Sequence, residues 1–276
     1  MISSKPYWDT PLKDEFEVKI VSFTEQDGQY HLTIDRDVIR PEGGGQAGEH
    51  GTLWIADLPV NILNTISGKE GTVLVVDSRV ESGQSARLVI DMKRRRALMR
   101  NHTAEHLFAS ELKRIYSDLE VGYTWIDQGN GTVEVLGAEF DEEMLFAAEA
   151  RVQEHIFAEK SVETVIVDAT TLSDRVRARE GVKSKHDKIR VVRIDEIDES
   201  ACSGIHVLNT SDIGIFKIIE YRIEETSAKI DFLTHREAAA SLQALFNSAL
   251  TRKHGFPFEM QQLGPILDKA KTAIHE

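Results

Sequence analysis

The middle of the chain contains Asn101-His102-Thr103-Ala104-Glu105-His106-Leu107, in which two histidines are four positions apart. Positions i and i+4 of a helix lie on one face, so both imidazoles can reach the same metal ion. The apolar spacing around the pair predicts a helix over residues 93–116. Its inward stripe consists of Leu98, His102, His106, Ala109, Leu112 and Tyr116. Alone, the pair also fits two packed or solvated helical histidines.

A second pair lies about a hundred residues further on, in Cys202-Ser203-Gly204-Ile205-His206. Cys202 is the only cysteine of the chain and could, by itself, be a small buried apolar residue. A thiolate combined with imidazoles is a donor set that suits Zn²⁺. The two pairs together predict one zinc site, formed by His102, His106, Cys202 and His206.

Composition indicates a globular protein with room for more than one domain. The chain has 276 residues, of which 41% are hydrophobic and 29% charged. A single cysteine excludes an internal disulfide and favours a cytoplasmic location. The apolar runs are too short to span a bilayer, so we expect no membrane association.

The net charge of −13 argues against a protein that coats nucleic acid through bulk electrostatics. Positive charge is nevertheless concentrated beside the first histidine pair, at Lys93-Arg94-Arg95-Arg96 and at Arg100. Such a run forms either a local nucleic-acid contact or a solvated helix face.

Residues 1–92 have the alternating pattern of short strands, at 16–20, 30–34, 51–55, 72–76 and 87–90. Strands of this length and spacing predict a small β-barrel. Between them lies a glycine-rich segment with Gly43, Gly44, Gly45 and Gln46. Three successive glycines allow the backbone to approach another group closely, although a flexible hairpin loop has the same composition.

The rest of the chain alternates strands and helices. Strands are predicted at 132–136, 162–167, 189–194, 215–221 and 228–233, and a helix capped by Asp141 runs to about residue 159. Residues 236–276 are predicted to be helical. Because two short helices bury little apolar surface, we expect them to support self-association.

Four stretches now carry a specific resemblance. They are residues 40–46 (Arg-Pro-Glu-Gly-Gly-Gly-Gln), 97–107, 202–206 and 211–218, in this order. Over roughly residues 5–235 the chain resembles the free-standing alanyl-tRNA editing proteins of the AlaX type and the editing domain of alanyl-tRNA synthetase. The resemblance implies an α+β fold: a translation-factor-like β-barrel (1–92), a zinc-containing editing domain (93–235) and a helical C-terminal extension (236–276).

The resemblance also implies a function. Such a protein acts in trans, with Zn²⁺, to hydrolyse the ester of alanine tRNA mischarged with serine or glycine. The pocket in which a synthetase charges its tRNA distinguishes amino acids that differ by one small group by only about 1–3 kcal/mol. A second, hydrolytic site is therefore needed to remove the errors. The partner would be tRNA(Ala), with a homodimer through the C-terminal helices as a further possibility.

Several residues receive roles from this resemblance. Thr124 matches a threonine of the amino-acid pocket, although without the family it would be an ordinary strand-edge residue. Thr103 and Gln46 are further candidates for selectivity. Glu105 could be a base or support the metal, or it could be a surface helix residue without a role. Gly43, Gly44 and Gly45 would border the substrate, and Arg94, Arg95, Arg96 and Arg100 would contact tRNA phosphates.

Two other functions are compatible with parts of the sequence. His102-Thr103-Ala104-Glu105-His106 fits the H-x-x-E-H pattern of inverted zincin peptidases, which leaves Cys202 and His206 unexplained. The other alternative is a non-catalytic tRNA-binding module with a structural zinc. Four protein ligands would fill the coordination sphere of the ion, whereas a catalytic zinc keeps one position open.

Overall fold

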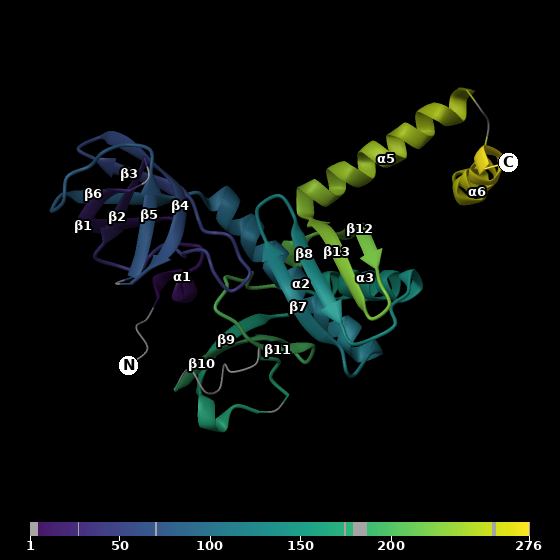
Figure 1. Ribbon diagram of the computed structural model, residues 1–276, viewed down its shortest axis with the longest axis horizontal. Helices are drawn as coiled ribbons and strands as arrows, with labels where there is room; N and C mark the ends of the chain where they lie inside the picture. Colours follow the sequence, from purple (N-terminus) through teal and green to yellow (C-terminus); the bar gives the residue numbers. More distant parts are fainter. Residues whose placement is uncertain are drawn as a thin grey trace. The chain divides into compact units, whose positions relative to one another are not determined.

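The computed structural model describes residues 5–26, 28–69, 71–173, 175–178, 187–255 and 258–275 (Figure 1). The chain forms two compact units, residues 1–235 and 236–276. The predicted α+β class, with a β-barrel and a helical C-terminal segment, is confirmed. The division of the first 235 residues into a barrel domain and an editing domain remains a prediction.

A closed barrel of six antiparallel strands, in the order β1-β2-β5-β4-β3-β6, forms the first part of the larger unit. Its strands are β1 (Glu15–Gln26), β2 (Gln29–Ile34), β3 (Gly51–Ile55), β4 (Leu58–Gly68), β5 (Gly71–Val76) and β6 (Ser85–Ile90). Ile20, Leu32 and Leu53 fill the interior and are at most 1% exposed. Sequence reasoning missed β4, because Pro59 and the polar residues along it obscure the alternation of Val60 with its inward neighbours.

The long helix α2 (Met92–Ile115) follows the barrel directly and carries the first histidine pair. Its N-terminus is capped by the Asp91 carboxylate, which accepts hydrogen bonds from the amides of Lys93 and Arg94. Its inward side chains, among them Leu98 and Phe108, are completely buried. The predicted helix is therefore present, shifted by one residue.

A four-stranded sheet in the order β12-β13-β8-β7 packs with α2 and α3 around one core. The strands of this sheet are β7 (Glu120–Ile126), β8 (Gly131–Leu136), β12 (Phe216–Ile223) and β13 (Ser227–Thr234), and the helix α3 spans Glu142–Phe157. The ring of Phe216 bridges the layers, with its centroid 5.3 Å from Phe108 of α2 and 5.0 Å from Phe232 of β13. Asp141 caps α3 as predicted, accepting from the Met144 amide.

A separate three-stranded sheet, in the order β11-β10-β9, carries the second ligand pair at its end. Its strands are β9 (Val162–Asp168), β10 (Lys188–Ile194) and β11 (Asp198–Ala201). Cys202 follows β11 immediately, so the end of this short strand places the thiol. The remaining short elements of the larger unit are α1 (Pro6–Asp9), η1 (Ala169–Thr171) and η2 (Thr210–Ile213).

The smaller unit contains α5 (His235–Gly255) from its second residue on, together with η3 (Met260–Gln262) and α6 (Leu263–His275). Several large apolar side chains of α5 are exposed, including Leu245 at 66% and Phe246 at 54%. Within the described ranges, no helix has the length and apolar character needed to cross a membrane.

Candidate metal centre

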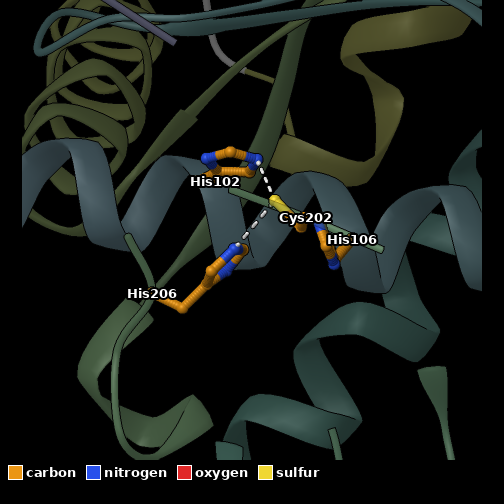
Figure 2. Close-up of side chains that lie close together, drawn as sticks. All are labelled: His102, His106, Cys202 and His206. Carbon is orange, nitrogen blue, oxygen red and sulfur yellow. Dashed lines mark hydrogen bonds between the residues drawn. The ribbon is translucent and has the colours of Figure 1, made fainter. Parts of the chain in front are cut away.

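The four predicted ligands meet in one cluster (Figure 2). The potential donor atoms of His102, His106, Cys202 and His206 all lie within 4.8 Å of one another. Cys202 Sγ is 3.4 Å from Nε2 of His102 and 3.4 Å from Nε2 of His206. A tetrahedral zinc with ordinary bond lengths separates a sulfur from a nitrogen ligand by ~3.6 Å, so these spacings fit one ion.

The outer ring nitrogen of each histidine has its own partner, supplied by a different segment. His102 Nδ1 lies 2.7 Å from Gln46 Oε1, which also accepts from the Ile205 amide. His106 Nδ1 lies 3.1 Å from the Asp198 carboxylate, which can only accept a hydrogen bond. Both Nδ1 atoms therefore carry the proton.

His206 completes this pattern through Thr103. The Thr103 hydroxyl donates to the Met99 carbonyl at 2.9 Å, which commits its only hydrogen. It therefore accepts from His206 Nδ1 at 3.2 Å and from the Val207 amide. Each imidazole thus has its Nδ1 proton held by an acceptor, so Nε2 is the nitrogen that a metal would bind, as is usual around protein-bound metals.

The charges around the cluster favour a thiolate. Burial raises the pKa of Cys202, but His102 and His206 outweigh it and hold that pKa well below its usual range. Burial also raises the pKa of Asp198, whereas Arg177 and His106 lower it to about 2. Burial lowers the pKa of His106, but Asp198 and Cys202 raise it to about 10. A metal ion at this site would therefore displace a proton from His106.

The glycine-rich loop reaches the cluster from the barrel. Gly45 and Ala47 exchange backbone hydrogen bonds with Ile126 of β7, at 2.8 and 2.9 Å, so the loop extends alongside this strand. A Cβ on Gly45 would lie 2.7 Å from the Thr124 carbonyl oxygen, and the φ of Gly45 is +82°. This close contact brings the side chain of Gln46, which is fully buried, against His102.

The backbone around Cys202 is tied by three donors that the sequence analysis did not identify. Arg190 of β10 donates to the carbonyls of Cys202 and Gly204, both at 2.9 Å. The carbonyl between them, that of Ser203, accepts from Arg40 at 3.3 Å and from the Trp8 indole at 3.0 Å. No sequence spacing relates these donors to Cys202, because each comes from a distant element.

The predicted phosphate contacts of the basic run require correction. Arg95 is fully buried and pairs with Glu49, its Nη2 lying 2.6 Å from Oε2. Arg94 is 8% exposed, donates to the Gly48 carbonyl and pairs with Asp127. Both therefore connect α2 to its surroundings and cannot serve as free phosphate contacts.

The other two arginines differ from these. Arg96 is exposed, and Arg100 is half-buried with its Nε 3.0 Å from the Asp212 carbonyl oxygen. Only Arg96 therefore has the exposure that an electrostatic contact with RNA needs, and its contact remains a prediction.

Of three further candidate residues, Glu105 and Thr103 contact ligands of the cluster, whereas Thr124 packs against Gly45 of the glycine-rich loop. Glu105 is only 3% exposed, with Oε2 3.9 Å from His106 Nε2 and Oε1 3.9 Å from Arg177, so the surface alternative is wrong. Thr124 on β7 is 6% exposed, and its hydroxyl has no hydrogen bond to any residue that the structure describes. Thr103, in contrast, has its hydroxyl fully engaged.

A pocket of about 490 Å³ adjoins the cluster and shares His206 with it. It is lined by Tyr7, Trp8, Asp9, Pro11, Val162, Glu163, Thr164, Arg190, Ile205, His206, Val207 and Leu208. The pocket thus lies between α1, the three-stranded sheet and the segment that carries the metal ligands.

Comparison with known proteins agrees with the motifs. Residues 189–232 match the family described as the second additional domain of threonyl- and alanyl-tRNA synthetases. The chain is 27% identical over 244 residues to the alanyl-tRNA editing protein AlaX-L of Pyrococcus horikoshii, a match that covers 87% of this chain and 60% of that protein.

Alanine–tRNA ligases are also similar. The enzyme of Haloquadratum walsbyi is 27% identical over 305 residues, covering 98% of this chain and 31% of the ligase. The ligase of Methanobrevibacter smithii is 30% identical over 248 residues, a match that covers 83% of this chain and 26% of that ligase. The chain spans less than two thirds of the length of each of these relatives. The resemblance to alanyl-tRNA editing proteins is confirmed.

Proposed function

We propose that this chain, as a relative of alanyl-tRNA editing proteins, hydrolyses the ester that joins a wrong amino acid to the 3′ end of alanine tRNA. The observation that supports this most directly is the cluster of Cys202 with three histidines, each with its Nδ1 held by a partner so that Nε2 faces the site. Serine and glycine are the amino acids we expect it to remove.

Zn²⁺ is the cofactor that fits the donor set, held by His102, His106, Cys202 and His206. When bound, it supplies a Lewis acid that can polarise an ester carbonyl or a water molecule. Gln46, Thr103 and Asp198 orient the histidine rings, so their contribution is one of positioning. Arg40 and Arg190 hold the backbone that carries Cys202.

Thr124 is the residue that we assign to the substrate side chain. It packs against Gly45, the neighbour of Gln46, and its hydroxyl has no partner among the described residues. A site that hydrogen-bonds a substrate hydroxyl discriminates strongly against the analogue that lacks it. Thr124 therefore distinguishes serine from the correct alanine.

The decisive experiment measures the release of serine from Ser-tRNA(Ala) and of alanine from Ala-tRNA(Ala), with casein cleavage in parallel. We expect rapid hydrolysis of the serine ester, slow hydrolysis of the alanine ester and no proteolysis. A Cys202→Ala variant should lose both bound zinc and deacylation. Binding of tRNA without turnover by the zinc-loaded protein would instead identify a non-catalytic module.

The peptidase alternative is less compatible with the arrangement. The groups that join the histidine pair are Cys202 and His206, and the carboxylate of Asp198 faces the outer nitrogen of His106. An inverted zincin peptidase would need a carboxylate as a ligand to the ion itself.

A further inference from the structure

We propose that the pocket beside His206 binds an adenine or cytosine base of single-stranded RNA. This inference rests on the proposed function and names the part of the substrate that adjoins the ester. The acceptor end of every tRNA is an unpaired C-C-A, so both bases are available there.

The position of the pocket suits such a role. His206 belongs both to the metal cluster and to the pocket wall, together with its neighbours Ile205 and Val207. A strand whose terminal ester lies at the cluster therefore has its neighbouring nucleotides within reach of this wall. Trp8 connects the two sites directly, because it lines the pocket and donates to the Ser203 carbonyl.

An aromatic ring and a guanidinium form the base platform. Trp8 is half-buried, and the guanidinium carbon of Arg190 lies 5.1 Å from its ring centroid. Unpaired bases characteristically stack on aromatic rings and on arginine planes. Lys5, whose Nζ is 5.2 Å from the same centroid, adds positive charge at the rim.

Arg190 also presents an unused donor. Its side chain is 9% exposed, and Nη1 is occupied by the carbonyls of Cys202 and Gly204. Its Nε is buried and has no hydrogen-bond partner among the described residues. A buried donor without a partner is unfavourable, and an acceptor on a bound nucleotide would satisfy it.

Two carboxylates decide which bases fit. Asp9 and Glu163 line the same pocket and are both exposed. A carboxylate accepts from the exocyclic amino group of cytosine or adenine, whereas the O4 atom of uracil offers only another acceptor.

The test is a calorimetric titration of the zinc-loaded full chain with the RNA tetranucleotides ACCA and UUUU. We expect wild-type protein to bind ACCA about fivefold or more tightly than UUUU. Glu163→Ala should remove this preference, and Trp8→Ala should weaken ACCA binding about fivefold or more. Glu220→Ala on β12 and Trp54→Ala on β3 are the matched controls and should bind as wild type.

Two further readouts separate the possible causes. Trp8→Phe keeps the ring but loses the bond to Ser203, so it should retain ACCA affinity if stacking is the contribution. Zinc content, measured by mass spectrometry, shows whether any Trp8 variant has disturbed the metal cluster instead.

The proposal is overturned if Glu163→Ala and Trp8→Ala bind both tetranucleotides as wild type does. It is equally overturned if Glu163→Ala tightens ACCA and UUUU alike, since the carboxylate would then act only through charge. Failure of the proposed function is a different result, namely wild-type protein that does not hydrolyse Ser-tRNA(Ala).

Discussion

Asp198 illustrates how one buried residue can determine the chemistry of a metal ligand. Its carboxylate is 7% exposed and accepts from His106, from Ser200 and from Arg177. Because it is an obligatory acceptor, it fixes the proton of His106 on Nδ1 and strengthens Nε2 as a donor to a metal.

Replacing Asp198 by asparagine should therefore weaken zinc binding by about 10- to 100-fold, because the neutral amide polarises His106 less. Competition with a chromophoric chelator measures the affinity. Asp195→Asn is the control: this aspartate pairs with Lys160 at 2.7 Å on the surface, away from the ligands. Equal affinity of the Asp198 variant and wild type would show that His106 needs no such partner.

Thr124 is the corresponding test of selectivity. Thr124→Val keeps the shape and removes the hydroxyl, so hydrolysis of Ser-tRNA(Ala) should slow while hydrolysis of Ala-tRNA(Ala) stays low or rises. The ratio of the two rates should fall. Thr52→Val, on β3 of the barrel, should leave the ratio unchanged. A wild-type ratio in the Thr124 variant would remove this residue from the amino-acid pocket.

Among the elements, the segment between β11 and η2 depends on one close packing contact. A Cβ on Gly204 would lie 2.1 Å from Cε1 of His102 and 3.0 Å from Gln46 Oε1. The missing side chain thus lets this segment, α2 and the barrel loop meet at one point.

Gly204→Ala should displace His102 and lower zinc affinity, with a loss in unfolding free energy of about 1–3 kcal/mol from overpacking. Zinc titration and denaturant unfolding measure the two effects. Gly129→Ala, where a Cβ would meet nothing within 4 Å, should change stability by no more than about 0.5 kcal/mol. Normal zinc affinity in the Gly204 variant would mean that the segment can move aside without cost.

The connection between α2 and the barrel depends on the buried pair of Arg95 and Glu49. Arg95→Met leaves the Glu49 carboxylate buried without its cation, so we expect unfolding free energy to fall by about 3–5 kcal/mol. Urea titration measures this. The exposed neighbour Arg96 provides the contrast, since Arg96→Ala should stay within about 0.5 kcal/mol of wild type. Similar stability of both variants would contradict a structural role for the pair.

For the whole molecule, the exposed apolar side chains of α5 bear on self-association. Leu245 and Phe246 are more than half exposed, so contact between copies of the smaller unit would remove them from water. We expect the full chain to dimerise and a Leu245→Glu, Phe246→Glu variant to be monomeric by sedimentation equilibrium. Gln243→Glu, on the same helix, should dimerise normally. A monomeric wild type at high micromolar concentration would contradict the prediction.

The sequence was sufficient wherever the decisive pattern is local. Helix α2 and the Asp141 cap follow from spacing and capping preferences. The two ligand pairs are also local, which is why their meeting could be anticipated. Sequence reasoning failed for β7 and β11, which are short or interrupted by a register shift, so that alternation is weak.

The residues that surround the metal ligands could not be predicted from the sequence, for a different reason. Asp198, Arg190 and Trp8 act through contacts between distant segments, and nothing in their own neighbourhoods marks them. Arg94 and Arg95 could not be recognised as buried, because side-chain charge does not reveal burial: Arg95 carries the same charge as the exposed Arg96 but lies inside the protein.

The bond between Gln46 and Ile205 joins positions 159 residues apart. Contacts of this separation form late in folding, because the closure entropy of the intervening chain opposes them until other structure has formed. During synthesis, the barrel and α2 leave the ribosome long before residue 205 does. An ion captured by all four ligands would therefore be acquired near the end of folding. Metal loading would then report that the chain has reached its native topology.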